Sequence, residues 1–202
     1  RGGRSVLGIR PLLWKNGWPV AGEVFKEGTY EIESERRGYA LELAVDFVRM
    51  EYTRHRFWEK DDTPVVPLKS QTLEDVIETW PQGKINVRIG DYMFRPHQKW
   101  TITAVPDGGG YLGGPYYKIV IEGTNRALAA TADAEVVTVP EFTGAPEQLW
   151  RIDQLTDGTY RIMPKEVPGT DKELVLASVG DSTPSLGEFD MNSDNSKWNF
   201  RD

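Results

Sequence analysis

The sequence of 202 residues contains no cysteine and only two histidines, His55 and His97. Without cysteine the chain has no disulfide bonds, no thiolate metal ligands and no cysteine nucleophile. The two histidines stand far apart in the sequence, and no group of residues has the spacing of a metal-ligand set. We therefore expect neither a metal nor a cofactor.

The sequence also has fewer basic than acidic residues and contains no long apolar run. The chain has 24 lysines and arginines against 31 aspartates and glutamates, which gives a formal net charge of −7. A surface that binds nucleic-acid phosphates depends on clustered lysine and arginine, so a nucleic-acid partner is not expected. No stretch is long and apolar enough to predict a membrane span, so no membrane partner is expected.

One pattern occurs three times in the sequence. It consists of Tyr-x-Ile, a small residue followed by Leu, an Asp five positions after that Leu, and a closing Trp-x-Ile or Trp-x-Phe. The three copies contain Tyr30, Ile32, Ala40, Leu41, Asp46, Trp100 and Ile102; Tyr117, Ile119, Ala127, Leu128, Asp133, Trp150 and Ile152; and Tyr160, Ile162, Val175, Leu176, Asp181, Trp198 and Phe200. In the second and third copies the Leu and the Trp are 22 positions apart.

A repeat of roughly forty residues that carries short alternating apolar runs predicts a supersecondary unit that packs against its own copies. Alternation with a period of two predicts strands whose aromatic and aliphatic side chains point into a shared core. Three copies predict a closed, threefold, all-β domain. Trp100, Trp150 and Trp198 are expected to be buried in its core.

The residues that close the copies resemble a known family. Gln98-Lys99-Trp100 and Gln148-Leu149-Trp150 match the Gln-x-Trp signature of ricin-type β-trefoil lectin domains, whereas Ser196-Lys197-Trp198 keeps only the Trp. The resemblance covers about Gly28 to Asp202. It implies a β-trefoil of twelve strands, four per repeat, which form a small barrel capped by three hairpins. The repeats would span residues 28–105, 116–157 and 158–202.

The first copy is interrupted by additional residues. Leu41 and Trp100 are 59 positions apart, which is 37 more than the spacing in the other copies and predicts an insertion over residues 48–91. Within it, residues 70–80 combine an N-cap candidate, early acidic residues and apolar positions at helical spacing, and Pro81 follows, so a short amphipathic helix is expected. Long ordered loops are typically functional or form interfaces. The insertion therefore either docks the domain on a neighbour or forms one wall of a ligand groove.

Glycines mark the connection between the first two copies. Asp107-Gly108-Gly109-Gly110 and Gly113-Gly114 predict a flexible loop there. No Gly-Lys-Ser/Thr sequence follows, so this is not a phosphate-binding loop.

Residues 1–27 lie outside the repeat. Two short apolar runs around Asn16-Gly17 predict a β-hairpin, and one interpretation of this segment is that it packs against the trefoil. The stretch Arg10–Val20 is similar to the closing strands of the catalytic propeller in family 43 glycoside hydrolases of the endo-arabinanase type, some of which carry a ricin-like domain immediately afterwards. This similarity implies that residues 1–27 are the end of, or the linker from, an upstream catalytic propeller.

The same similarity bears on activity and location. It implies a parent enzyme of the arabinan endo-1,5-α-L-arabinosidase type, whose catalytic carboxylates belong to the propeller. No catalytic residue is therefore expected in these 202 residues, and an activity of this stretch on its own is not expected. A polysaccharide-degrading parent implies a secreted or periplasmic protein.

A sugar-binding repeat needs an acidic group for neighbouring hydroxyls, an aromatic face for the apolar side of the sugar ring and, in most cases, an amide. Asp46, Asp133 and Asp181 recur just after the second strand of each copy. They either bind sugar or cap the turns in which they lie.

The resemblance places the ligand acid directly after the Leu of the second strand. There only Glu42 of the first copy is acidic, because the second and third copies have Ala129 and Ala177. Gln98 and Gln148 either reach a ligand or bond the backbone of the barrel. Among the tryptophans of the insertion, Trp58 is the candidate for stacking on a sugar ring. The helical spacing of the apolar residues makes Trp80 mainly a packing residue.

Two functions follow as hypotheses. The first is a carbohydrate-binding accessory domain of an arabinan-degrading glycoside hydrolase, with arabinan or a related plant polysaccharide and its own upstream catalytic domain as partners. The alternative is a purely structural trefoil that packs on the propeller and stabilises it without a sugar ligand. The missing acids of the second and third copies favour the alternative.

Overall fold

A computed structural model of the chain describes residues 12–15, 18–21, 25–36, 38–45, 72–111, 114–180 and 182–202. In the first two of these ranges, β1 (Leu12–Lys15) and β2 (Trp18–Ala21) pair antiparallel, with Lys15 opposite Trp18. The hairpin predicted around Asn16-Gly17 is thereby confirmed. No helix in the described ranges is long and apolar enough to cross a membrane.

Twelve further strands in the described part of the chain form three repeats of four strands. Repeat one contains β3 (Gly28–Ser34), β4 (Ala40–Leu43), β5 (Ile85–Gly90) and β6 (Trp100–Tyr111). Repeat two contains β7 (Gly114–Ile121), β8 (Ala127–Ala130), β9 (Val136–Val139) and β10 (Trp150–Gln154). Repeat three contains β11 (Tyr160–Pro164), β12 (Val175–Val179), β13 (Thr183–Gly187) and β14 (Trp198–Arg201). A 3-10 turn precedes each fourth strand: η1 (Pro96–Gln98), η2 (Pro146–Gln148) and η3 (Asp194–Ser196).

The first and fourth strands of the repeats close into a barrel. β3 pairs with β6, β6 with β7, β7 with β10, β10 with β11, β11 with β14, and β14 with β3. Closure pairs each of these strands on both sides and so removes the unpaired edges of an open sheet.

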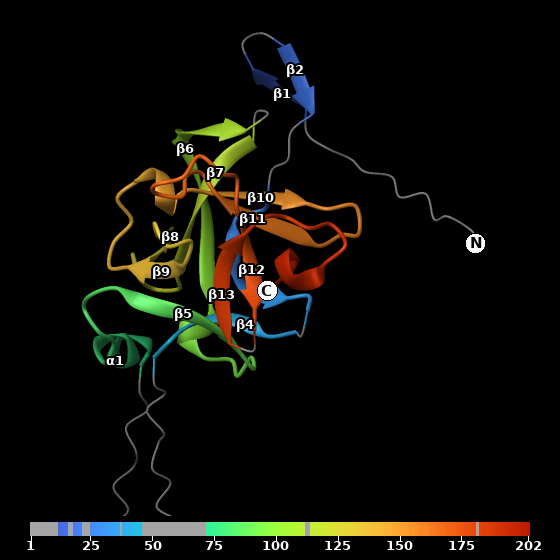
Figure 1. Cartoon of the computed structure of the whole chain (residues 1–202). Coiled ribbons are helices and arrows are strands. Elements are labelled where there is room, and N and C mark those ends of the chain that lie inside the picture. The colour runs from blue at the N-terminus through green and yellow to red at the C-terminus, as the bar shows by residue number, and fades with distance from the viewer. Residues whose placement is uncertain are drawn as a thin grey trace, which may run out of the picture.

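The second and third strands form the hairpins β4–β5, β8–β9 and β12–β13 (Figure 1). These hairpins also contact one another: β5 pairs with β9, the Ile89 N–H donates to the Ser182 carbonyl at 2.9 Å, and the Leu186 N–H donates to the Ala134 carbonyl at 2.8 Å. Six barrel strands and three mutually bonded hairpins make a β-trefoil, which confirms the predicted all-β fold.

The core explains why the pattern recurs. Trp100, Trp150 and Trp198 are each fully buried, as predicted. Each indole Nε1 donates a hydrogen bond to the carbonyl of the Leu of its own repeat, at 2.8 Å to Leu41, 2.9 Å to Leu128 and 2.9 Å to Leu176. The Trp therefore ties the fourth strand to the second strand in every repeat. Because a buried carbonyl without a donor is costly, each repeat keeps both the Leu and the Trp, whatever the number of residues between them.

A residue ahead of the first repeat also belongs to the core. Phe25 is buried, and its ring packs against Tyr30, Tyr117, Tyr160 and Phe200, with centroid separations of 4.5 to 6.0 Å. The Phe25 N–H also donates to the Tyr117 hydroxyl at 2.7 Å. Since the three tyrosines start the three repeats, Phe25 contacts all of them at once. Residues 25–27 are thus packed onto the trefoil through this side chain.

The structure places a framework strand inside the predicted insertion. β5 lies within the range 48–91, and its Ile89 is opposite Leu41 although the two are 48 positions apart. The corresponding pairs, Leu128–Thr138 and Leu176–Leu186, are 10 positions apart. The additional residues are therefore confined to the connection between β4 and β5.

The predicted helix is present in that connection as α1 (Leu73–Glu78), at the lower left of Figure 1. Thr72 and Asp75 form a capping box at its start. Trp80 is buried in the core, as predicted. The Arg126 guanidinium donates to the carbonyls of Pro81 and Gly83 at 2.8 and 2.7 Å, which fastens the end of this segment to repeat two.

The glycine-rich stretch between repeats one and two departs from the prediction. β6 continues through residues 107–110 to Tyr111, and Gly110 pairs with Pro115 of β7. The register shifts between Val105 and Gly110, as at a β-bulge, a position at which glycine is favoured. Residues 107–111 therefore belong to a strand with an irregular ladder and not to a loop, whereas Gly113 of the predicted loop lies outside the described residues.

Candidate functional site

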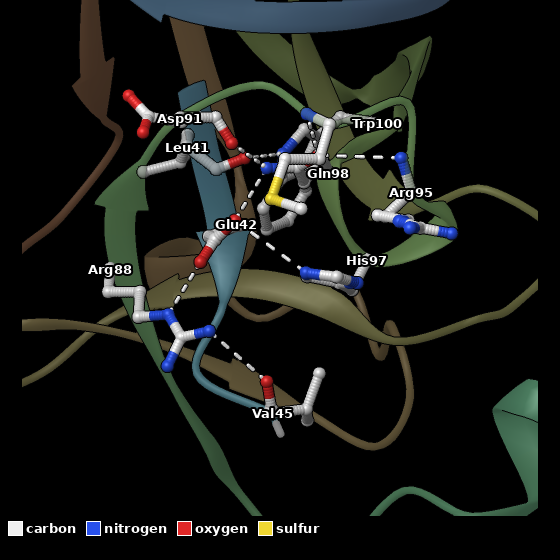
Figure 2. Close-up of polar contacts among 10 residues, drawn as sticks. Leu41, Glu42, Val45, Arg88, Asp91, Arg95, His97, Gln98 and Trp100 are labelled. Carbon is white, nitrogen blue, oxygen red and sulfur yellow. Dashed lines mark hydrogen bonds and ion pairs between the residues drawn. The ribbon is translucent and has the colours of Figure 1, made fainter. Parts of the chain in front are cut away.

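The predicted ligand acid lies in a polar cluster of repeat one. Glu42 is on β4 directly opposite Arg88 of β5, and its side chain is buried. The Arg88 Nε donates to Glu42 Oε1 at 2.5 Å, and the Arg88 NH2 group donates to the Val45 carbonyl at 3.2 Å. Arg88 therefore bonds the carboxylate and the backbone just beyond β4 (Figure 2).

The second oxygen of Glu42 faces η1. Gln98 Nε2 donates to Glu42 Oε2 at 2.6 Å, and His97 Nε2 lies 3.6 Å from the same oxygen. Both η1 side chains are buried. The structure thus brings together two predicted site residues, Glu42 and Gln98, and adds Arg88 and His97 (Figure 2).

Gln98 also holds the loop that precedes η1. Its Nε2 donates to the Asp91 carbonyl at 2.8 Å, while its Oε1 accepts from the Met93 N–H at 2.8 Å and the Arg95 N–H at 3.4 Å. The amide has therefore filled its hydrogen-bonding capacity with protein groups. Bonding of the backbone, one of the two predicted roles for Gln98, is confirmed.

The cluster keeps Glu42 ionised. Burial acts to raise the pKa of the Glu42 carboxyl, but His97, Arg88 and Gln98 together outweigh burial, and the pKa lies below its ordinary value. A buried, ionised carboxylate with donors on both oxygens suits a fixed structural geometry. Such a carboxylate carries no proton near neutral pH and so cannot serve as a general acid there.

The same positions in repeat two carry no acid. Ala129 lies opposite Val137, where repeat one has Glu42 opposite Arg88. Gln148 is buried, and its Oε1 accepts from the N–H and the hydroxyl of Thr143 at 2.7 and 3.2 Å. Gln148 therefore also bonds its own loop. Asp133 is exposed in the β8–β9 turn, where the Thr131 hydroxyl accepts from the Glu135 N–H.

Repeat three also lacks the acid, because Ala177 lies opposite Ser185 and Ser196 replaces the glutamine. Asp46, Trp58 and Asp181 lie outside the described residues. The stacking role of Trp58 and the recurrence of three turn aspartates therefore stay predictions. In the described ranges no group of three His, Asp or Glu side chains is arranged to hold a metal ion.

Two features of repeat one were missed by the sequence reasoning. The first is that Arg88 lies opposite Glu42. The sequence does not indicate this pairing, because the insertion separates β4 from β5. The loop between β5 and η1 carries an aromatic pair, Tyr92 and Phe94, whose ring centroids are 4.7 Å apart. A signal was present in the sequence, since Phe142 and Phe189 occupy the corresponding loops of the other repeats.

A cavity of about 360 Å³ lies beside repeat three. It is bounded by Tyr116 of β7, Arg151 of β10 and the long connection between β11 and β12, residues 165–173. None of the predicted site residues lines it.

Comparison with known proteins finds a family match over part of the chain. Residues 96–183 match the family model described as ricin-type beta-trefoil lectin domain-like. No curated protein matches the chain.

Several solved structures share the fold. A designed threefold-symmetric protein, ThreeFoil, is 18% identical, with a TM-score of 0.56 over 86% of this chain and 98% of its own. A Polyporus squamosus lectin bound to the epitope Neu5Acα2-6Galβ1-4GlcNAc is 16% identical, with a TM-score of 0.55 over 87% of this chain and 49% of its own. An exo-β-1,3-galactanase from Clostridium thermocellum is 14% identical, with a TM-score of 0.54 over 91% of this chain and 32% of its own. This chain thus spans about half the length of the lectin and a third of the galactanase.

Proposed function

We propose that this chain is a carbohydrate-binding β-trefoil that acts as an accessory domain of an arabinan-degrading glycoside hydrolase of family 43. It would be secreted or periplasmic and hold its upstream catalytic domain close to plant polysaccharide. The observation that carries the proposal is the closed trefoil whose residues 96–183 match a lectin-like family model. A galactanase of which about a third resembles this chain supports the accessory role.

Binding of this kind is expected to be weak. Polysaccharide hydroxyls are already hydrated, so each hydrogen bond to the protein contributes only about 1 kcal/mol net, and stacking on aromatic rings supplies much of the rest. Repeats two and three have alanine where repeat one has Glu42, so few sites are active. We expect dissociation constants in the high micromolar to millimolar range.

The direct test is titration calorimetry with soluble arabinan, galactan and xylan fragments. The proposal predicts saturable heat with at least one of them, arabinan first. An unrelated β-trefoil of similar charge that binds no plant polysaccharide serves as the control. An absence of heat at millimolar ligand with all three polysaccharides would contradict the proposal.

Two observations favour a second function. Both carboxylate oxygens of Glu42 already bond protein groups, and Phe25 is packed into the core. In this alternative the trefoil has no sugar ligand and stabilises the upstream propeller by packing on it. The packing of Phe25 against three repeats would then give the propeller a rigid point of attachment on the trefoil. In the full-length parent enzyme, deletion of residues 25–202 would lower the unfolding temperature of the propeller while leaving its affinity for polysaccharide unchanged. Loss of affinity with unchanged thermal stability would favour the carbohydrate-binding function.

A further inference from the structure

Each repeat carries aromatic side chains in the loop between its third strand and its 3-10 turn. Repeat one has Tyr92 and Phe94, repeat two has Phe142, and repeat three has Phe189. The three loops are therefore comparable in position. They differ in what covers the rings.

In repeats two and three a cation lies over the ring. Lys118 Nζ is 5.5 Å from the centroid of Phe142, and the Arg161 guanidinium carbon is 5.2 Å from the centroid of Phe189. Both cations directly follow the tyrosine that starts their repeat. Such a cation–π contact covers one face of the ring and leaves less of it for stacking on a ligand.

Repeat one has an acid in place of that cation. Glu31 follows Tyr30 on β3 and is buried. A carboxylate cannot make the cation–π contact, because the face of an aromatic ring carries negative charge. Within the described ranges no cation lies over the ring of Tyr92 or Phe94.

Phe94 combines an exposed ring with a strained backbone conformation. Phe94 is 82% exposed and the neighbouring Met93 is 57% exposed. The φ angle of Phe94 is +55°, a left-handed conformation that bulky residues rarely adopt. Backbone strain of this kind is found mainly at functional sites. Glycine would relieve it, so the phenyl ring at this position calls for a reason other than stability.

The loop is held in place before any ligand arrives. The buried Gln98 bonds the backbone at Asp91, Met93 and Arg95 and is itself bonded to Glu42 (Figure 2). Tyr92 supports Phe94 with a tilted ring contact at 4.7 Å. A preformed loop avoids the entropic cost of ordering on binding.

We infer that the loop Asp91–Arg95 is the saccharide-stacking platform of repeat one, with the apolar C–H face of a neutral sugar ring packing on Phe94. This inference rests on the proposed function, and it assigns Glu42 to supporting the loop instead of contacting the sugar. In the described part of the chain the apolar patch consists of Tyr92, Met93 and Phe94, which matches the size of a sugar ring and not a protein interface of about 20–30 residues on each side. The exposed Asp91 beside the patch offers an acceptor for sugar hydroxyls.

The test compares Phe94→Ala and Phe94→Gly with the unaltered chain in titrations against soluble arabinan, galactan and xylan fragments. Both variants are expected to weaken binding by about tenfold, the value of one lost stacking contact. Their unfolding temperatures should stay unchanged or rise, because the ring is exposed and glycine relieves the strain. Met191→Ala, which truncates a side chain 72% exposed in the corresponding loop of repeat three, should bind like the unaltered chain.

The outcomes separate the two proposals. If the chain binds polysaccharide and both Phe94 variants bind equally well, the platform is wrong and the proposed function stands. If the chain binds none of the polysaccharides tested, the proposed function fails and the platform fails with it. If Phe94 instead drives concentration-dependent self-association that both variants abolish, the patch is an interface between copies of this chain and the saccharide assignment is overturned.

Discussion

At the scale of single residues, the indole nitrogens account for the sequence pattern. Trp150→Phe leaves the buried Leu128 carbonyl without its donor and opens space in the core. We expect a loss of about 2–4 kcal/mol in the free energy of unfolding, measured by urea denaturation. Trp198→Phe should cost a similar amount, because Trp198 makes the same bond to Leu176. A loss below about 1 kcal/mol for both would contradict this role for the Leu–Trp pair.

Glu42 predicts a pH dependence of stability at the same scale. Because the pKa of its carboxyl is lowered on folding, Glu42 stabilises the fold at pH values above its ordinary pKa of 4.5, and that contribution disappears as the pH falls through the lowered folded value. Glu42→Gln should therefore be less stable than the unaltered chain at pH 7, and the difference should shrink steadily below about pH 4.5. Chemical denaturation between pH 7 and pH 3 measures this difference. A gap that stays constant across the range would show that Arg88 and His97 do not act on the charge of Glu42.

At the scale of elements, the segment before β3 is predicted to be part of the folding unit. Phe25→Ala removes a buried ring that contacts four others. The expected loss is about 3–5 kcal/mol in the free energy of unfolding. The matched control, Phe94→Ala, removes an exposed ring and should change stability by less than about 0.5 kcal/mol. Equal effects of the two substitutions would mean that Phe25 is not part of the core.

The strands differ in how far their pairing could be predicted from the sequence. The recurrence of Leu and Trp predicted the repeats because each pair is joined by one hydrogen bond in the core. The pairing of Glu42 with Arg88 was not predictable, because 45 residues separate them and only the placement of β5 reveals their register. The glycines at 108–110 suggested a loop because glycine favours turns and bulges alike, and pairing with β7 decided between the two.

At the scale of the whole molecule, the three repeats share one fold and have diverged in their surface chemistry. The buried Trp–Leu bonds are the same in all three. The acid of Glu42 and the uncovered aromatic ring occur together only in repeat one, within the described ranges. The buried Trp–Leu bonds are common to the three repeats, whereas the surface residues around them differ from one repeat to the next.

The most direct measurement of the central claim is chemical-shift mapping on isotopically labelled protein during titration with arabinan, galactan or xylan oligosaccharides. A carbohydrate-binding trefoil with one stacking platform predicts progressive shifts of the amides of residues 91–95 and of the side-chain amide of Gln98. The corresponding loops, residues 140–145 and 188–193, should shift little. An absence of shifts with every oligosaccharide, or shifts centred on repeats two and three, would contradict the account.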